Sequence, residues 1–277
     1  MSDKEFKGKS VLITGGGGGF GAAFSLALAE RGAAVTLTDI NETAGAEAVK
    51  AITAAGGQAR FMLHDVTDDA SWGRAVELAL SECGGLDIVI NNAGIEISQL
   101  LIDTDPAECL DLLNINVVGT MLGMKHAFEV MRPEGAAGKG GVILNLASVA
   151  AISATPGLAV YSASKAAVSN LTWVGAAESG RQGYGVRVNS LCPSLIDTAM
   201  GKKLIKDFAE MGFGESIGEV EDALLERMPI GRYGTVKDVV EAALYLCSER
   251  SSFLTGVSLP VDGGMSVSYT HLRAHET

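Results

Sequence analysis

Residues 10–21 have the sequence SVLITGGGGGFG, and this stretch decides the fold class. The apolar run 10–14 is typical of a buried strand, the glycines follow at once, and an alanine-rich stretch with helical character runs over 22–31. A strand, a glycine turn and a helix in this order are the context of a dinucleotide-binding turn. Glycines let the backbone approach a pyrophosphate, and the helix N-terminus supplies free N–H donors. A flexible glycine linker is the alternative, and the flanking strand and helix argue against it.

A carboxylate stands at the end of the next predicted strand. Residues 34–39 (AVTLTD) end at Asp39, about 20 residues beyond the glycine turn. An acidic side chain there accepts hydrogen bonds from the adenosine ribose hydroxyls and repels a 2′-phosphate. No lysine or arginine follows directly, so the sequence predicts NAD(H) in preference to NADP(H). A capping role for Asp39 at the next helix is compatible with this interpretation.

Tyr161 and Lys165 are the strongest candidates for chemistry. Positions i and i+4 of a helix share a face, so both side chains can reach one site. A nearby cation favours the phenolate and lowers the pKa of a tyrosine, which makes it usable as a general acid or base. Ser148 adds a neutral hydroxyl to hold a substrate oxygen. The Tyr-x-x-x-Lys pattern alone occurs on many solvated helix faces. It indicates a catalytic pair here because the same chain also carries the glycine turn.

The rest of the chain alternates between strand and helix patterns. Further strands are predicted at 59–64, 86–90, 142–146, 186–191 and 257–261, with helices at 42–55, 68–83, 106–131, 158–179 and 236–248. The pattern predicts an α/β fold: one Rossmann-type, doubly wound parallel sheet of about seven strands, with right-handed crossovers and helices on both faces. The single domain is expected to span 1–267.

Composition excludes several classes of partner. The chain has 277 residues and a net charge of −12, which argues against binding to nucleic acid and to anionic membranes. Residues 140–164 carry no charge, but polar residues and helix breakers interrupt them, so a transmembrane reading is rejected. The N-terminus has no apolar signal core, and the cysteines and histidines show no metal-binding spacing. A cytoplasmic protein without a catalytic metal is expected.

These motifs together resemble the short-chain dehydrogenase/reductase family, over about Lys7 to Gly264. The resemblance rests on the glycine turn and on five further motifs in family order: Asp65-Val66, Asn91 to Gly94, Asn116 in NINVVG, Ser148 with Tyr161 and Lys165, and Asp262 to Gly264. Two departures stand out. Ser194 replaces the glycine that usually follows Pro193, and Phe20 replaces an isoleucine beside the pyrophosphate.

The resemblance implies a catalytic tetrad of Asn116, Ser148, Tyr161 and Lys165. Tyr161 would exchange the alcohol proton while hydride passes to or from the nicotinamide ring, and Ser148 would hold the substrate oxygen. Lys165 would lower the pKa of Tyr161 and bind the nicotinamide ribose, and Asn116 would position a water that links Lys165 to solvent. The predicted function is NAD(H)-dependent interconversion of a secondary alcohol and a ketone. A non-catalytic NAD(H)-binding scaffold or sensor, and an NADPH-dependent ketoacyl-carrier reductase, are the alternatives.

The resemblance also implies the residues that contact the cofactor, which come from every motif. They are Gly15, Gly17, Gly18, Gly19, Phe20, Gly21, Asp39, Ile40, Asp65, Val66, Asn92, Ala93, Gly94, Tyr161, Lys165, Pro193, Ile196 and Thr198.

Two segments lie outside these motifs. Residues 199–228 are expected to form a substrate-covering lid with glycine hinges, and 268–277 to be a non-native tail. Small or apolar residues are expected to line the substrate pocket, namely Ile95, Ile97, Val149, Ala150, Ala154 and Leu158, together with several residues of the lid. Such a pocket suits a small-molecule alcohol or ketone of moderate size, as in hydroxysteroid dehydrogenases, and the resemblance implies a homotetramer.

Overall fold

The computed structural model describes residues 4–268 and contains one parallel sheet of seven strands in the order β3-β2-β1-β4-β5-β6-β7. Every neighbouring pair of these strands is parallel. The predicted doubly wound Rossmann-type fold is confirmed. The strands are β1 (Ser10–Thr14), β2 (Ala34–Asp39), β3 (Gln58–Leu63), β4 (Ile88–Asn91), β5 (Gly141–Leu146), β6 (Val186–Pro193) and β7 (Ser258–Val261).

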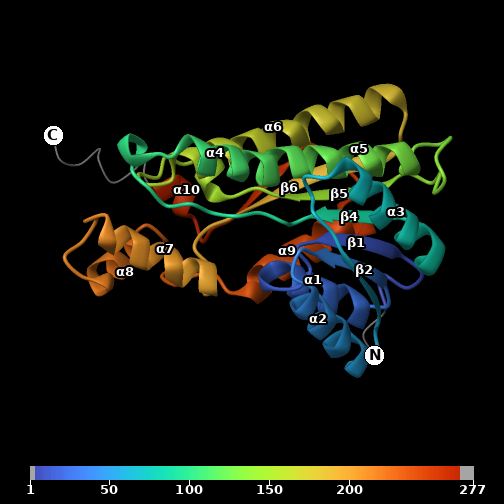
Figure 1. Ribbon diagram of the computed structural model, residues 1–277, viewed down its shortest axis with the longest axis horizontal. Coiled ribbons are helices and arrows are strands. Elements are labelled where there is room, and N and C mark those ends of the chain that lie inside the picture. The colour runs from blue at the N-terminus through green and yellow to red at the C-terminus, as the bar shows by residue number, and fades with distance from the viewer. Residues whose placement is uncertain (1–3, 269–277) are drawn as a thin grey trace.

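Helices cover both faces of the sheet, as Figure 1 shows. One face carries α1 (Gly19–Glu30), α2 (Glu42–Ala54) and α9 (Val236–Cys247). The other carries α3 (Asp69–Cys83), α4 (Pro106–Leu113), α5 (Gly119–Met131) and α6 (Ala159–Gln182). Three short 3₁₀ turns lie at Leu101–Asp103, Val149–Ala151 and Glu249–Ser251.

Alternation along β1 explains why both faces are buried. Val11 and Ile13 belong to the apolar cluster that includes residues of α1 and α9, whereas Leu12 belongs to the cluster with residues of α3 and α5. Side chains of successive strand residues point to opposite faces, so a strand covered on both sides is apolar throughout. The continuous run SVLIT is the sequence signature of this arrangement.

The predicted helix over 106–131 is wrong in one respect. It consists of α4 and α5 joined by a π-helical segment, Asn114–Val118, in which Asn116 is buried. A π turn accommodates one extra residue without breaking the helix, so the apolar spacing on either side still looks helical. The insertion turns the side chain of Asn116 inward, toward α6 and the loop after β4.

The segment predicted as a lid forms two helices beside the sheet, α7 (Ala199–Glu210) and α8 (Ile217–Glu226) (Figure 1). The Thr198 and Ser216 side chains cap their first turns, and Gly212 adopts a φ of +79° just after α7. Apolar residues of both helices pack with Val149 and Leu158 of the main body. The last described element is α10 (Met265–Ser268).

The structure describes the whole of the uncharged segment but little of the predicted C-terminal tail. Residues 140–164 form β5, a loop with a 3₁₀ turn and the start of α6, and within 4–268 no helix is long and apolar enough to cross a membrane. Nearly all of the predicted non-native tail lies outside the described residues.

Candidate active site

The glycine loop between β1 and α1 is shaped so that only glycine fits at its critical positions. Gly15 and Gly19 have φ values of +63° and +52°, which side chains rarely adopt. A Cβ on Gly21 would lie 2.1 Å from the Gly15 carbonyl oxygen. Helix α1 begins directly after this loop, and no side chain in the described part of the chain caps its first turn. Its first N–H groups are therefore available to an anionic ligand.

The loop after β4 is tied to the glycine loop. The Thr14 hydroxyl accepts hydrogen bonds from the backbone N–H groups of Asn92 and Ala93, both at 3.1 Å. The Asn92 side-chain amide donates to the carbonyls of Thr14 at 2.9 Å and Gly15 at 3.1 Å. Strands β1 and β4 flank the point where the strand order reverses, which is where open α/β sheets bind ligands.

The Asp39 carboxylate lies beside the glycine loop. One of its oxygens accepts from the Gly17 N–H at 2.9 Å, and the other accepts from the Asn41 N–H at 2.9 Å. Each carboxylate oxygen has more than one lone pair, so both can accept a further hydrogen bond from a vicinal diol such as a ribose. The cap of α2 is the Asn41 side chain, so the capping role considered for Asp39 is wrong.

Three further groups form the wall after β3. Hydrogen bonds from the Thr67 backbone and hydroxyl hold the pKa of Asp65 below its usual range. Burial lowers the pKa of His64 to about 4, so this imidazole is neutral at physiological pH. Val66 is buried, and its carbonyl accepts from the Trp72 indole at 2.9 Å. His64 was missed in the sequence because a lone histidine before the Asp-Val pair carries no distinguishing pattern.

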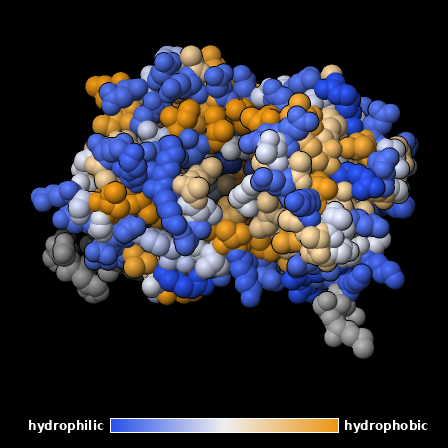
Figure 2. All heavy atoms as spheres, turned by 60° about the horizontal axis from the view of Figure 1, so that its bottom comes forward, coloured by the Kyte–Doolittle hydropathy of each residue, from blue (hydrophilic) through white to orange (hydrophobic). Residues whose placement is uncertain are grey.

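These elements surround a cavity of about 950 Å³ at the carboxyl ends of the strands. The space-filling view shows a hollow near the centre of one face of the molecule (Figure 2). Most of the predicted site residues line the cavity: Gly15, Gly18, Gly19, Phe20, Asp39, Ile40, Asp65, Val66, Asn92, Ala93, Gly94, Ser148, Tyr161, Lys165, Pro193, Ile196 and Thr198. Three predicted site residues do not line the cavity but pack behind residues that do, namely Gly17, Gly21 and Asn116.

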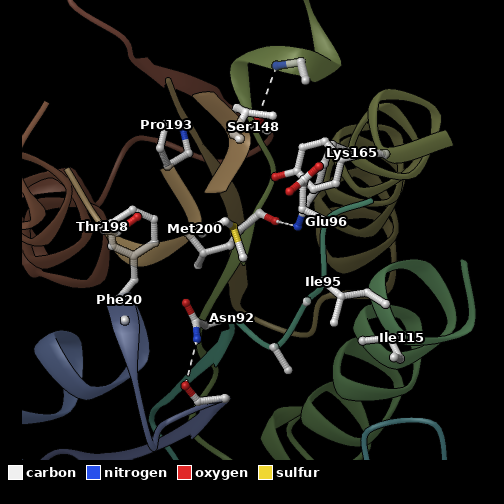
Figure 3. Close-up of a pocket in the computed structure, with 18 of the residues that line it drawn as sticks. Phe20, Asn92, Ile95, Glu96, Ile115, Ser148, Lys165, Pro193, Thr198 and Met200 are labelled. Atoms are coloured by element: carbon white, nitrogen blue, oxygen red, sulfur yellow. Dashed lines mark hydrogen bonds between the residues drawn. The ribbon is translucent and has the colours of Figure 1, made fainter. Parts of the chain in front are cut away.

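Ser148, Tyr161 and Lys165 meet at one end of this cavity. Ser148 follows β5, and its hydroxyl accepts from the Ala150 N–H at 3.2 Å. The Lys165 ammonium lies 5.7 Å from the centre of the Tyr161 ring, which confirms that the two share a face of α6. Figure 3 shows Ser148 and Lys165 near one end of the cavity and Phe20 and Asn92 near the other.

The pKa of Tyr161 differs from the lowered value that the sequence predicted. Burial raises the pKa of Tyr161 to about 12, and a hydrogen bond with Ser148 offsets this only in part. Burial also lowers the pKa of Lys165 to about 8. The Lys165 ammonium donates to the Leu146 carbonyl at 2.8 Å. In the protein alone, desolvation therefore outweighs the attraction on which the expectation rested.

Asn116 is buried, and its side chain forms hydrogen bonds with the loop after β4 and with α6. Its amide nitrogen donates to the Ile95 carbonyl at 2.9 Å and to the Ser164 hydroxyl at 3.1 Å, and its oxygen accepts from the Ile95 N–H at 2.9 Å. A Cβ on Gly94 would lie 3.0 Å from that oxygen and 3.4 Å from the Lys165 ammonium. Asn116 thus fixes the loop after β4 close to Lys165.

The remaining wall is largely apolar and comes from both the main body and the lid. Its members include Ile95, Val149, Ala150 and Leu158, joined by Leu204, Phe208 and Leu224 of α7 and α8. Ile97 and Ala154, which were expected to line the pocket, do not. Glu96 does line it and was missed, because a single charge between two isoleucines resembles an exposed loop position.

The two departures from the family pattern are accommodated. Within 4–268 no residue other than glycine has a positive φ, so Ser194 adopts ordinary backbone angles. Its N–H donates to the Val261 carbonyl at 3.2 Å, which keeps this loop beside β7. Phe20 stacks on Phe24, one turn further along α1, with ring centres 6.0 Å apart. The ring, which is larger than the usual isoleucine side chain, therefore packs along its own helix.

The residues present fit a nicotinamide dinucleotide. The Asp39 carboxylate matches a ribose diol at one end, the tight glycine loop and the open start of α1 match a pyrophosphate, and Tyr161 with Lys165 match the reacting end. Within the described part of the chain, no three side chains of His, Cys, Asp or Glu are grouped so that they could hold a metal ion.

Comparison with known proteins gives consistent matches. The sequence family described as Enoyl-(Acyl carrier protein) reductase matches residues 16–266. The chain is 36% identical to 2-(S)-hydroxypropyl-CoM dehydrogenase 3 of Xanthobacter autotrophicus, covering 96% of this chain and 99% of that protein. It is also 36% identical to cyclopentanol dehydrogenase of a Comamonas species, with 92% and 96% covered. The crystal structure of NAD⁺-bound xylitol dehydrogenase superposes with a TM-score of 0.88 at 30% identity, covering 94% of this chain and all of that one.

Proposed function

The chain belongs to the short-chain dehydrogenase/reductase family of oxidoreductases, and we propose that it interconverts a secondary alcohol and a ketone with NAD(H). One observation carries the proposal: a single cavity holds Ser148, Tyr161 and Lys165 at one end and the glycine loop with Asp39 at the other. A substrate and a dinucleotide bound in that cavity meet where the acid–base group lies. NAD⁺, when bound there, supplies the hydride acceptor for the alcohol, and NADH the donor for the ketone.

Four side chains of the site have separate roles in the proposed reaction. Tyr161 removes the alcohol proton in oxidation and returns it in reduction, and Ser148 holds the substrate oxygen beside the Tyr161 hydroxyl. Lys165 binds the nicotinamide ribose hydroxyls through its ammonium group. Asn116 is proposed to keep the loop after β4 in place, because its amide holds both the N–H and the carbonyl of Ile95.

NAD(H) is proposed as the preferred cofactor. The Asp39 carboxylate already accepts the Gly17 and Asn41 N–H groups and would repel a 2′-phosphate. The solved relative xylitol dehydrogenase binds NAD⁺, which supports this choice. The same charge argues against an NADPH-dependent ketoacyl-carrier reductase.

The relatives also support the class of reaction. They are named as dehydrogenases of hydroxypropyl and cyclopentanol substrates, which are secondary alcohols. We further propose that the protein works in the cytoplasm as a homotetramer. Its four cysteines are free thiols, and Trp173 and Val174 expose apolar side chains on α6 that a second copy can cover.

The proposal is tested by following NADH formation from secondary alcohols, with NADP⁺ in parallel, in the wild-type protein and Tyr161→Phe. Loss of the phenol is expected to reduce kcat about 1,000-fold or more while NADH binding persists, because general acid–base catalysis contributes on this scale. Tyr245→Phe, at a partly exposed position of α9, is the matched control and retains wild-type rates.

The other outcomes are equally informative. Residual activity of Tyr161→Phe above a few per cent would remove Tyr161 from its role. A wild-type protein that binds NADH but oxidises no alcohol would instead support the scaffold or sensor alternative. Preference for NADP⁺ would refute the argument from Asp39.

A further inference from the structure

Glu96 places a buried carboxylate in the substrate end of the cavity. Its side chain is only 4% exposed, yet it lines the cavity together with Ser148 and Tyr161. The preceding residue, Ile95, is held at both its N–H and its carbonyl by Asn116, each at 2.9 Å, so the position of Glu96 is fixed. Figure 3 shows Glu96 near Lys165, in the part of the cavity that also holds Ser148.

The two oxygens of Glu96 differ in their partners. Oε1 accepts a short hydrogen bond from the Ser98 hydroxyl. Oε2 is buried and accepts no hydrogen bond from any residue within 4–268. The Lys203 ammonium of α7 lies 3.8 Å from Oε2, too far for a hydrogen bond, and donates to Asp207 on its own helix. A buried carboxylate oxygen with unused lone pairs is costly unless a donor from the protein, water or a ligand hydrogen-bonds to it.

We propose that Glu96 determines substrate specificity by accepting a hydrogen bond from a second hydroxyl group, carried near the carbinol carbon. The inference rests on the proposed function and names its substrate class: short diols, and the hydroxyketones that they yield. A substrate with one hydroxyl group leaves Oε2 unpaired in the closed site, whereas a diol pairs it.

The surroundings of Glu96 favour a neutral donor over a cation. The Lys203 ammonium already offsets the negative charge at Oε2, and it would repel a second ammonium group at this place. The neighbouring wall is apolar, formed by Val149, Leu158 and lid residues such as Leu204, which gives a charged group no solvation. Burial also raises the pKa of Glu96, and the charge of this carboxylate in turn raises the pKa of Tyr161.

The experiment compares kcat/KM for matched pairs of substrates with NAD⁺. The pairs are cyclohexanol with 1,2-cyclohexanediol, and 2-butanol with 2,3-butanediol and 1,3-butanediol. The wild-type protein is expected to favour at least one diol over its partner by about 10- to 100-fold, the range for a hydrogen bond to a charged group. In Glu96→Leu this ratio falls to near one, and in Glu96→Gln, whose amide oxygen still accepts, it lies between.

Two controls keep the result specific. Glu210→Gln makes the same change of charge on the exposed side of α7 and leaves the ratio at its wild-type value. NADH binding by each Glu96 variant shows that the glycine loop and the fold are intact.

Each result decides one claim. Oxidation of all alcohols without preference for a diol, or an unchanged preference in Glu96→Leu, would overturn the role of Glu96 and leave the proposed function standing. Failure of the wild-type protein to oxidise any alcohol, with NADH still bound, would refute the proposed function and this inference together.

Discussion

Replacing Lys165 with methionine tests how strongly the cavity desolvates the buried ammonium group of this residue. Lys165 is 6% exposed, and burial lowers its pKa from 10.5 to about 8. Between pH 8 and 10.5 the unfolded chain therefore holds a proton that the folded chain has released. Stability rises with pH wherever the unfolded state binds more protons. The contribution of Lys165 to the free energy of unfolding thus increases across this window.

The size of the effect follows from the two pKa values. A change from 10.5 to about 8 corresponds to about 3 kcal/mol at 1.36 kcal/mol per pKa unit. Below pH 8 the buried ammonium destabilises the fold by this amount, and above 10.5 the cost disappears. Methionine has a similar length and no charge, so Lys165→Met is expected to be the more stable protein at pH 7 and to lose this advantage at high pH.

The assay is urea unfolding of the cofactor-free wild-type protein and Lys165→Met at intervals between pH 7 and pH 10.5. The raised pKa values of Tyr161 and Cys247 affect both proteins alike. The Lys165 charge also lowers the pKa of Cys192, so the difference between the two curves reports Lys165 together with its coupling to Cys192. Lys50→Met, at an exposed position of α2, is the matched control for the loss of a lysine. Parallel pH curves for the wild-type protein and Lys165→Met would show that Lys165 is not desolvated and would refute the reasoning.

Two further substitutions test the cofactor end of the cavity. Asp39→Ala is expected to reduce the proposed preference for NAD⁺ over NADP⁺ by about tenfold (roughly 1.4 kcal/mol), because the carboxylate that would repel a 2′-phosphate is gone. An unchanged ratio of kcat/KM for the two cofactors would contradict this. Gly21→Ala puts a Cβ 2.1 Å from the Gly15 carbonyl oxygen and is expected to cost about 3 kcal/mol in urea unfolding and to abolish NADH binding. Gly18→Ala, where a Cβ meets nothing within 4 Å, should change stability by less than about 0.5 kcal/mol, and equal losses in both variants would refute the steric argument.

The fold was predictable because its signals are local. A buried parallel strand is a continuous apolar run, and a tight βα turn needs glycine, so residues 10–21 identify both. Element ends are less local, since they depend on how far a neighbouring strand extends. Strand β6, predicted to end at 191, continues to Pro193 because that residue pairs with Val261 of β7.

The chemistry of the site was only partly predictable. Helical spacing placed Tyr161 and Lys165 on one face, which the 5.7 Å separation confirms, but spacing says nothing about desolvation, which sets their pKa values. The π turn at Asn114–Val118 leaves no trace in the apolar pattern. Lys203 of α7, far along the chain, lies 3.8 Å from the Glu96 carboxylate, a contact that no local pattern predicts.

The cavity wall runs from Gly15, directly after the first strand, to Met265 in the last described helix. Such a pocket is complete only once the whole chain has been synthesised and folded. A dinucleotide that binds there at 100 times its Kd adds about 2.7 kcal/mol of stability, and only to finished molecules. In a cell, bound cofactor would then protect the folded protein from proteolysis, because it stabilises molecules whose cavity has formed.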